Sequence, residues 1–161
     1  GPGEHAGTMS EVEVRRTIWN VASALTYLHS IKVVHGDVYL HNVMSDEDGV
    51  ARLSDLGASF VCDSSELIKE RLESIEVLAF GRLVQDLYSW HMNIDLPDSI
   101  IIDEGLRATG RVRRNAPGMK DGPLRDLLAS ILQPDQSLRP TFKSLMNTLS
   151  QLPDFASLEM D

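Results

Sequence analysis

The stretch HGDVYLHNVMSDEDGVARLSDLG, residues 35–57, decides how the rest of the chain is interpreted. It opens with His35-Gly36-Asp37, reaches Asn42 after four further residues, and ends with Asp55-Leu56-Gly57 thirteen positions later. Short apolar segments flank the turn Asp46-Glu47-Asp48-Gly49, where glycine tolerates the positive φ that a tight turn needs. The pattern predicts a small β-hairpin over residues 42–53, whose open end brings Asn42 and Asp55 close together.

The spacing of Asp37, Asn42 and Asp55 resembles the His-Arg-Asp-x-x-x-x-Asn and Asp-Phe-Gly motifs of the protein kinase superfamily. The resemblance implies phosphoryl transfer from ATP, with Asp37 and Asn42 as catalytic residues and Asp37 as the base. It implies that Asn42 and Asp55 bind Mg²⁺, and that Asn42, Asp55 and Gly57 belong to the nucleotide site. Two oxygen ligands at the base of one hairpin also suit a hard cation.

An acidic surface hairpin without a metal is the competing interpretation, because Asp and Asn populate turns for backbone reasons alone. We adopt it for Asp46 and Asp48, whereas the joint spacing of Asp37, Asn42 and Asp55 favours a kinase-type site. His35 could be a general base, but a structural role against the Asp-Leu-Gly turn is preferred. We assign no role to His41.

Composition limits the class of protein. The chain has 161 residues, 42% hydrophobic and 24% charged, which is ordinary for one globular domain. The net charge of −9 argues against nucleic acid as a partner. The single cysteine, Cys62, fits a reducing compartment, and no apolar run has the length of a membrane span, so we expect a cytoplasmic protein.

Two long helices are predicted before residue 92. Ser10-Glu11-Val12-Glu13 is a capping box, and apolar residues at helical spacing continue to about His29-Ser30. A nearly apolar helix is predicted over 75–90, with Glu66–Leu72 as a separate helical segment. In the superfamily an Asp at position 76 ties this helix to the catalytic loop, and we expect the longer Glu76 to do so less rigidly.

Two more helices are predicted on either side of the sequence QPDQSLRPTF, residues 133–142. Pro134 stops the first, and Pro140 is placed in the opening turn of the second. The sequence resembles the end of a protein kinase domain, in which Arg139 would pair with the Glu of an Ala-Pro-Glu motif. No such motif follows Gly57, so the partner of Arg139 is left open.

The expected fold is mainly α (α+β), a kinase-like large lobe in which a helical bundle carries the catalytic loop on a small hairpin. We expect a tail or a cloning remnant at 1–9, the lobe at 10–152 and a C-terminal tail at 153–161. Neither a Gly-rich loop nor a Val-Ala-Ile-Lys strand occurs in the sequence. The small lobe is therefore a missing segment, and we expect the isolated chain to be inactive.

Three functions stay open. The first is a protein kinase, most similar to the bacterial and plant kinases associated with leucine-rich repeats. The second is a small-molecule phosphotransferase of the aminoglycoside or choline kinase type, which shares the HGD motif and lacks Ala-Pro-Glu. The third is a pseudokinase or scaffold, because Tyr39 stands where serine/threonine kinases place a lysine that neutralises phosphate charge.

Overall fold

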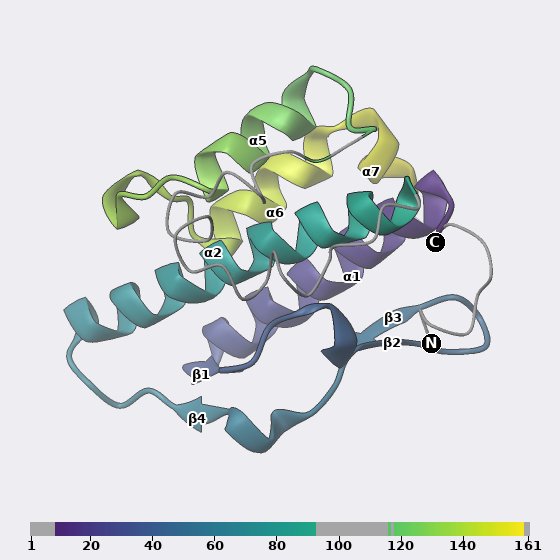
Figure 1. Ribbon diagram of the computed structural model, residues 1–161. Coiled ribbons are helices and arrows are strands. Elements are labelled where there is room, and N and C mark those ends of the chain that lie inside the picture. The colour runs from purple at the N-terminus through teal and green to yellow at the C-terminus, as the bar shows by residue number, and fades with distance from the viewer. Residues whose placement is uncertain (1–8, 93–115, 117, 160–161) are drawn as a thin grey trace, which may run out of the picture.

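The computed structural model describes residues 9–92, 116 and 118–159. Of the tail expected at 1–9, residues 1–8 lie outside the described part, as do residues 93–115, 117 and 160–161. Met9, the last residue of that expected tail, is buried in the core. Figure 1 shows α1 and α2 running through the middle of the molecule, with α5, α6 and α7 on one side and the short strands on the other. The described part is therefore mainly helical, as predicted, with two small antiparallel strand pairs where one hairpin was expected.

Helix α1, Glu11–Ser30, begins at the predicted capping box. The Glu13 N–H donates to Ser10 Oγ at 3.2 Å, and the Ser10 N–H donates to Glu13 Oε1 at 3.4 Å. These bonds satisfy amides that have no partner inside the helix. The buried stripe of α1 packs on α2, α6 and β3. Its apolar members are Val14, Ile18, Val21, Ala22 and Leu25.

Helix α2 runs without interruption from Glu66 to His91. The prediction that Glu66–Leu72 and residues 75–90 form two separate helices was therefore wrong. Ser65 caps the helix, since its side chain accepts the Ile68 N–H. The later turns are buried and the first turns are largely exposed. The apolar pattern therefore marks only the part of the helix that crosses the core.

Two antiparallel strand pairs lie beside the helices. The predicted hairpin is present: β2, Val43–Ser45, pairs with β3, Ala51–Leu53. Gly49 in its turn has φ +79°, as the turn pattern requires. The second pair joins β1, Val33–Val34, to β4, Phe60–Val61. It brings the segment after the Asp-Leu-Gly turn back beside the strand that enters residues 35–42.

The last part of the chain forms α5 (Pro123–Ile131), α6 (Phe142–Gln151) and α7 (Pro153–Glu159). Thr141 caps α6, so Pro140 lies before the cap. The prediction that Pro140 lies in the opening turn of this helix was therefore wrong. Helix α7 occupies the segment expected to be a tail, and Phe155 is buried in the core at 1% exposure. None of the helices in the described ranges has both the length and the hydrophobicity needed to cross a bilayer.

Candidate active site

Residues 35–42 follow β1 and bring two of the predicted catalytic residues into contact. Asn42 is buried at the end of a short 3-10 turn, η2 (Leu40–Asn42). Its Nδ2 donates to the Asp37 backbone oxygen at 2.7 Å and to Asp37 Oδ2 at 3.1 Å. Asp37 itself is only half-buried. The carboxylate is thus oriented by an amide and still reaches solvent.

Glu76, on the buried part of α2, holds the start of this loop. Its Oε1 accepts the His35 N–H at 3.0 Å, and its Oε2 accepts the Gly36 N–H at 2.9 Å. His29 Nε2 lies 2.9 Å from the same Oε1. Burial raises the pKa of Glu76, but the hydrogen bonds from His29, Gly36 and His35 outweigh it and leave the pKa below its ordinary value. The tie between helix and loop that the sequence suggested is present, and it uses both oxygens.

His35 is fully buried, and its ring bonds fix its role. Nε2 lies 2.9 Å from the Ser54 backbone oxygen, and Nδ1 accepts the Asp37 N–H at 3.1 Å. Because the Ser54 oxygen only accepts and the Asp37 N–H only donates, Nε2 is the donor of the ring and Nδ1 its acceptor. His35 therefore links the loop to the residue before Asp55, which agrees with the structural role preferred from the sequence.

The base of the hairpin connects Asn42 to Asp55 through Ser54. The Asn42 backbone oxygen accepts from the Ser54 N–H at 2.7 Å and from Ser54 Oγ at 2.8 Å. Asp55 follows in the left-handed region at φ 57°, which is uncommon for a residue other than glycine. Its Oδ1 accepts the Gly57 N–H at 3.2 Å. The turn thereby presents an exposed carboxylate next to the end of β3.

Asn42 and Asp55 supply oxygens that suit Mg²⁺. Since Asn42 Nδ2 is committed to Asp37, the Oδ1 atom is the one left to face a cation. The described residues contain no group of three or more His, Cys, Asp or Glu side chains that could hold a metal. A cation here would have two protein ligands and take the others from phosphate and water, as Mg²⁺ at phosphate sites usually does.

The loop carries an aromatic contact that the sequence did not reveal. The rings of Tyr39 and His41, both exposed, meet edge to face with their centroids 3.7 Å apart. The two residues flank Leu40, the first residue of the 3-10 turn η2, and this turn brings their rings into contact. No pattern in the sequence signals this turn.

Arg139 binds backbone carbonyls in place of a carboxylate. Its Nε donates to Gln133 O at 2.7 Å, Nη1 to Ser74 O at 3.3 Å, and Nη2 to Pro134 O at 3.2 Å. Burial lowers the pKa of Arg139, and the charge of Arg82 lowers it further. The residue therefore ties the α5–α6 connection to α2. These backbone carbonyls are the partners of Arg139 that the sequence left open.

Comparison with known proteins supports the resemblance. The protein kinase domain family matches residues 3–94, which is more than half of the chain. The chain is 28% identical to testis-specific serine/threonine-protein kinase 1 of Mus musculus, over 88% of this chain and 45% of that protein. It is 27% identical to the megakaryocyte-associated tyrosine-protein kinase of Rattus norvegicus, over 82% of this chain and 32% of that protein.

These relatives fix the class but not the acceptor hydroxyl, since one is a serine/threonine kinase and the other a tyrosine kinase by name. The chain spans less than half the length of either relative. The family match covers α1, the loop, the hairpin and α2. With the loop geometry and the matched residues in agreement, the chain belongs to the protein kinase domain family.

Proposed function

We propose that this chain is the large lobe of a protein kinase and that it transfers the γ-phosphoryl group of ATP to a hydroxyl. The contact between Asn42 and Asp37 carries the proposal, because it places an amide that can bind a metal beside a carboxylate that can act as a base. The lobe would comprise residues 10–152, extended by α7. The nucleotide clamp would come from a small lobe outside this chain.

In the proposed reaction Asp37 accepts the proton of the acceptor hydroxyl as the oxygen attacks the γ-phosphorus. The bond from that phosphorus to the bridging oxygen of the β-phosphate breaks, and ADP leaves. Asn42 holds Asp37 in place through Nδ2. Asn42 and Asp55 would bind Mg²⁺, which when present neutralises charge on the phosphates. Gly57 fixes the Asp55 carboxylate through its N–H. Catalysis of this type depends on positioning and charge rather than on covalent chemistry.

A protein hydroxyl is the acceptor we favour, of the serine/threonine type, in a kinase related to the bacterial and plant proteins associated with leucine-rich repeats. The single Cys62, buried and free, favours a cytoplasmic location. One observation favours the small-molecule alternative: only residues 58–65 lie between the Asp-Leu-Gly turn and α2. Such a short segment leaves little chain to hold a peptide.

The pseudokinase alternative rests on Tyr39, which replaces a positive charge. Titration of the full-length protein with ATP in the presence and absence of Mg²⁺ tests this alternative, because a protein kinase and a small-molecule phosphotransferase both require Mg²⁺-dependent binding of ATP. Phosphorylation assays with protein, aminoglycoside and choline acceptors then separate the two enzymes. Failure to bind ATP with Mg²⁺ would contradict the proposed function.

Asp55→Asn should remove most of the activity of the full-length protein. The change deletes the carboxylate charge that Mg²⁺ needs, and loss of a preorganised charge contact costs on the order of 100-fold in rate. Asp48→Asn is the matched control, since Asp48 is exposed in the hairpin turn and its side chain has no partner in the described part of the chain. Steady-state rates with ATP and Mg²⁺ check this.

Asp46→Asn is a second control on the same hairpin. Asp46 Oδ1 accepts the Asp48 and Val50 N–H groups, each at 2.9 Å, and an amide oxygen can accept the same bonds. Rates should stay within a few-fold of the parent for both controls. Equal losses at positions 46, 48 and 55 would mean that the hairpin is not a metal site.

A further inference from the structure

A cavity of about 240 Å³ lies where the first turns of α1 and α5 meet the end of α2 and the start of α7. Its lining comes from Glu11 and Arg15 of α1, Tyr88 of α2, residues 119–124 and residues 152–155. No residue of the candidate catalytic loop, the hairpin or the Asp-Leu-Gly turn belongs to this lining. The cavity is therefore separate from the candidate active site.

Much of the wall of the cavity is apolar. Met119 and Phe155 are buried, and Leu124 and Leu152 are half-buried. Phe155 comes from α7, the helix that the sequence did not predict. A dry apolar cavity of about 150 Å³ is large enough to bind benzene. The space between these side chains can therefore hold a single ring or a short aliphatic chain.

Tyr88 adds a polar group to this apolar lining. Its side chain is buried, and no hydrogen bond within the described part of the chain involves its hydroxyl. Burial raises the pKa of Tyr88, and the charges of Glu11 and Asp154 raise it further. Since Glu11 and Asp154 also line the cavity, the hydroxyl end of the ring faces it. A buried tyrosine hydroxyl usually has a hydrogen-bond partner, and a ligand in the cavity can accept its proton.

The first turn of α5 offers further donors beside the cavity. Its N-cap residue, Gly122, has no side chain that could cap the helix, and Pro123 has no N–H. The N–H groups of Leu124 and Arg125 donate to no other group in the described ranges. Free N–H groups at the start of a helix carry partial positive charge. The hydroxyl and this turn both present hydrogens, which indicates a ligand with an accepting oxygen.

The charges around the cavity balance one another. Among the described residues that line it or act on Tyr88, three are cationic and three are acidic: Arg15, Lys120 and Arg125 against Glu11, Asp121 and Asp154.

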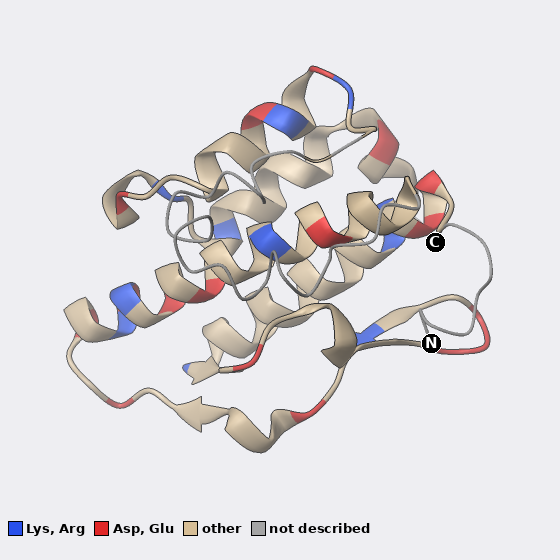
Figure 2. Cartoon of the chain, viewed as in Figure 1, with Lys and Arg blue, Asp and Glu red and all other residues tan. Residues whose placement is uncertain are grey.

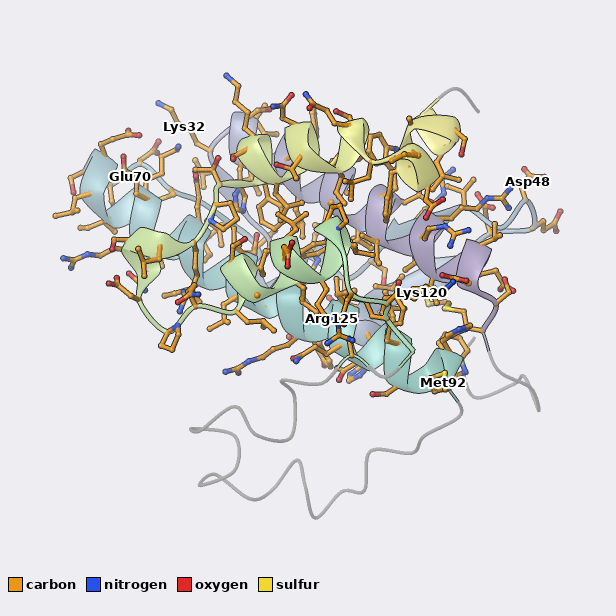
Figure 3. The ribbon with its side chains drawn as sticks, turned by 90° about the horizontal axis from the view of Figure 1, so that it is seen from above. Lys32, Asp48, Glu70, Met92, Lys120 and Arg125 are labelled. Carbon is orange, nitrogen blue, oxygen red and sulfur yellow. The ribbon has the colours of Figure 1, made fainter. Side chains whose placement is uncertain are left out.

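Four of these six side chains form ion pairs. Arg15 lies 3.1 Å from Glu11, and Arg125 lies 3.4 Å from Asp121. Lys120 precedes α5, and Arg125 lies in its first turn (Figure 3). A charged ligand would meet no net charge of the opposite sign. Charge complementarity therefore favours a neutral ligand.

We propose that this cavity binds a small neutral molecule made of one ring, or a short aliphatic chain, and a carbonyl oxygen. The apolar part would lie against Phe155 and Leu152, and the oxygen would accept from the Tyr88 hydroxyl and the first turn of α5. Such a molecule would contact α1, α2, α5 and α7 at once. Its binding does not require kinase activity and can be measured on the chain whether or not the full-length protein transfers phosphate.

Benzamide is the probe for this site, and benzoate is a charged molecule of nearly the same shape. Titration of the 161-residue chain with benzamide should shift the Leu124 and Arg125 amide signals in nitrogen-15 spectra, with a Kd on the order of 1 mM. Benzoate should bind about 5-fold more weakly, since no net positive charge meets it. Absence of shifts up to about 20 mM benzamide, or benzoate binding as tightly as benzamide, would overturn the proposal.

Tyr88→Phe tests the hydroxyl, because the change removes that group and keeps the ring. The Kd for benzamide should rise about 5-fold, as expected for the loss of one neutral hydrogen bond. Tyr27→Phe is the matched control: Tyr27 is exposed and does not line the cavity, so its Kd should stay within twofold of the parent. A Kd in Tyr88→Phe equal to that of the control would contradict the proposed site.

Leu124→Trp tests the cavity itself without touching Tyr88. Leu124 is half-buried at the start of α5, so a larger side chain there fills the cavity from its rim. Benzamide should no longer bind to this variant, whose folding is checked by urea unfolding. Binding with the affinity of the parent would place the probe elsewhere on the chain and overturn the proposal.

Discussion

At the scale of single residues, Gly36 shows how closely the candidate loop is packed. Its φ is +87°, and a Cβ added there would lie 2.5 Å from the Ala58 backbone oxygen. A side chain at this position meets both backbone strain and a steric clash with the segment after the Asp-Leu-Gly turn. The arginine that kinases often carry here has no room, and the loop is held instead through its amides by Glu76.

Gly36→Ala should destabilise the chain more than Gly49→Ala does. Both glycines have positive φ, which costs a residue with a Cβ about 1–2 kcal/mol. Near Gly49 the nearest atom is the mobile end of Arg16 at 3.9 Å, so strain is the only cost there. At Gly36 the clash with backbone adds about 1–3 kcal/mol. Urea unfolding of both variants measures the difference, and equal losses would mean that the Ala58 segment moves away without cost.

The residue contacts that could be predicted were those encoded by spacing. Four residues between Asp37 and Asn42 are enough to identify the pair, and the pair is in contact. The link through Ser54 could not be predicted, because it depends on how residues 35 and 54, nineteen positions apart, meet in space. The metal and base roles of Asp37, Asn42, Asp55 and Gly57 remain predictions that await binding and rate measurements.

At the scale of elements, α2 shows the limit of hydrophobic patterns. The apolar residues from Val77 onward predict a buried helix and mark the part that crosses the core. The first turns lack that pattern because most of their side chains are exposed and do not pack against the core. Strands β1 and β4 and helix α7 are too short to produce a recognisable period, and tertiary contacts form them.

Tyr88 of α2 gives the fold an alkaline limit. Burial of its side chain, 2% exposed, raises its pKa from 10.0 to about 12. The folded chain therefore keeps the phenol proton after the unfolded chain has lost it. The stability from this group is complete below pH 10 and is lost as the pH rises towards 12.

Tyr88→Phe should flatten this pH dependence. Between about pH 9 and pH 11 the free energy of unfolding of the parent should fall by about 1.4 kcal/mol through the titration of Tyr88. This contribution should be absent from the variant. Tyr27→Phe is the control, because Tyr27 is 63% exposed. Urea unfolding across this pH range measures the slope. A slope in Tyr88→Phe equal to that of the parent would show that the phenol does not titrate differently in the two states.

At the scale of the whole molecule, charge is dispersed, and one group of exposed apolar side chains lies on the strand side. Figure 2 shows Lys and Arg scattered over several helices in the described part. Large exposed apolar side chains occur along the loop, the hairpin and β4, on the strand side seen in Figure 1. The members of this group are Tyr39, Met44, Val50, Leu56, Phe60 and Val61, and further exposed apolar side chains lie on the helices. We expect the small lobe of the full-length protein to cover part of this side.

The 161 residues alone should therefore be inactive even if the full-length protein is an efficient kinase. Asp37, Asn42 and Asp55 supply a base and two metal ligands, whereas the grip on the ATP phosphates needs further donors. Positioning and charge neutralisation account for nearly all the rate acceleration in this chemistry, so a chain that binds only part of the ATP phosphates should show almost no activity.

The measurement compares ATP turnover by the isolated chain and by the full-length protein at equal protein concentration and equal Mg²⁺. Asp55→Asn in both forms is the control for contaminating kinases, because only activity that this change removes belongs to the site. Turnover by the isolated chain within 10-fold of the full-length protein, and abolished by Asp55→Asn, would show that one lobe is enough.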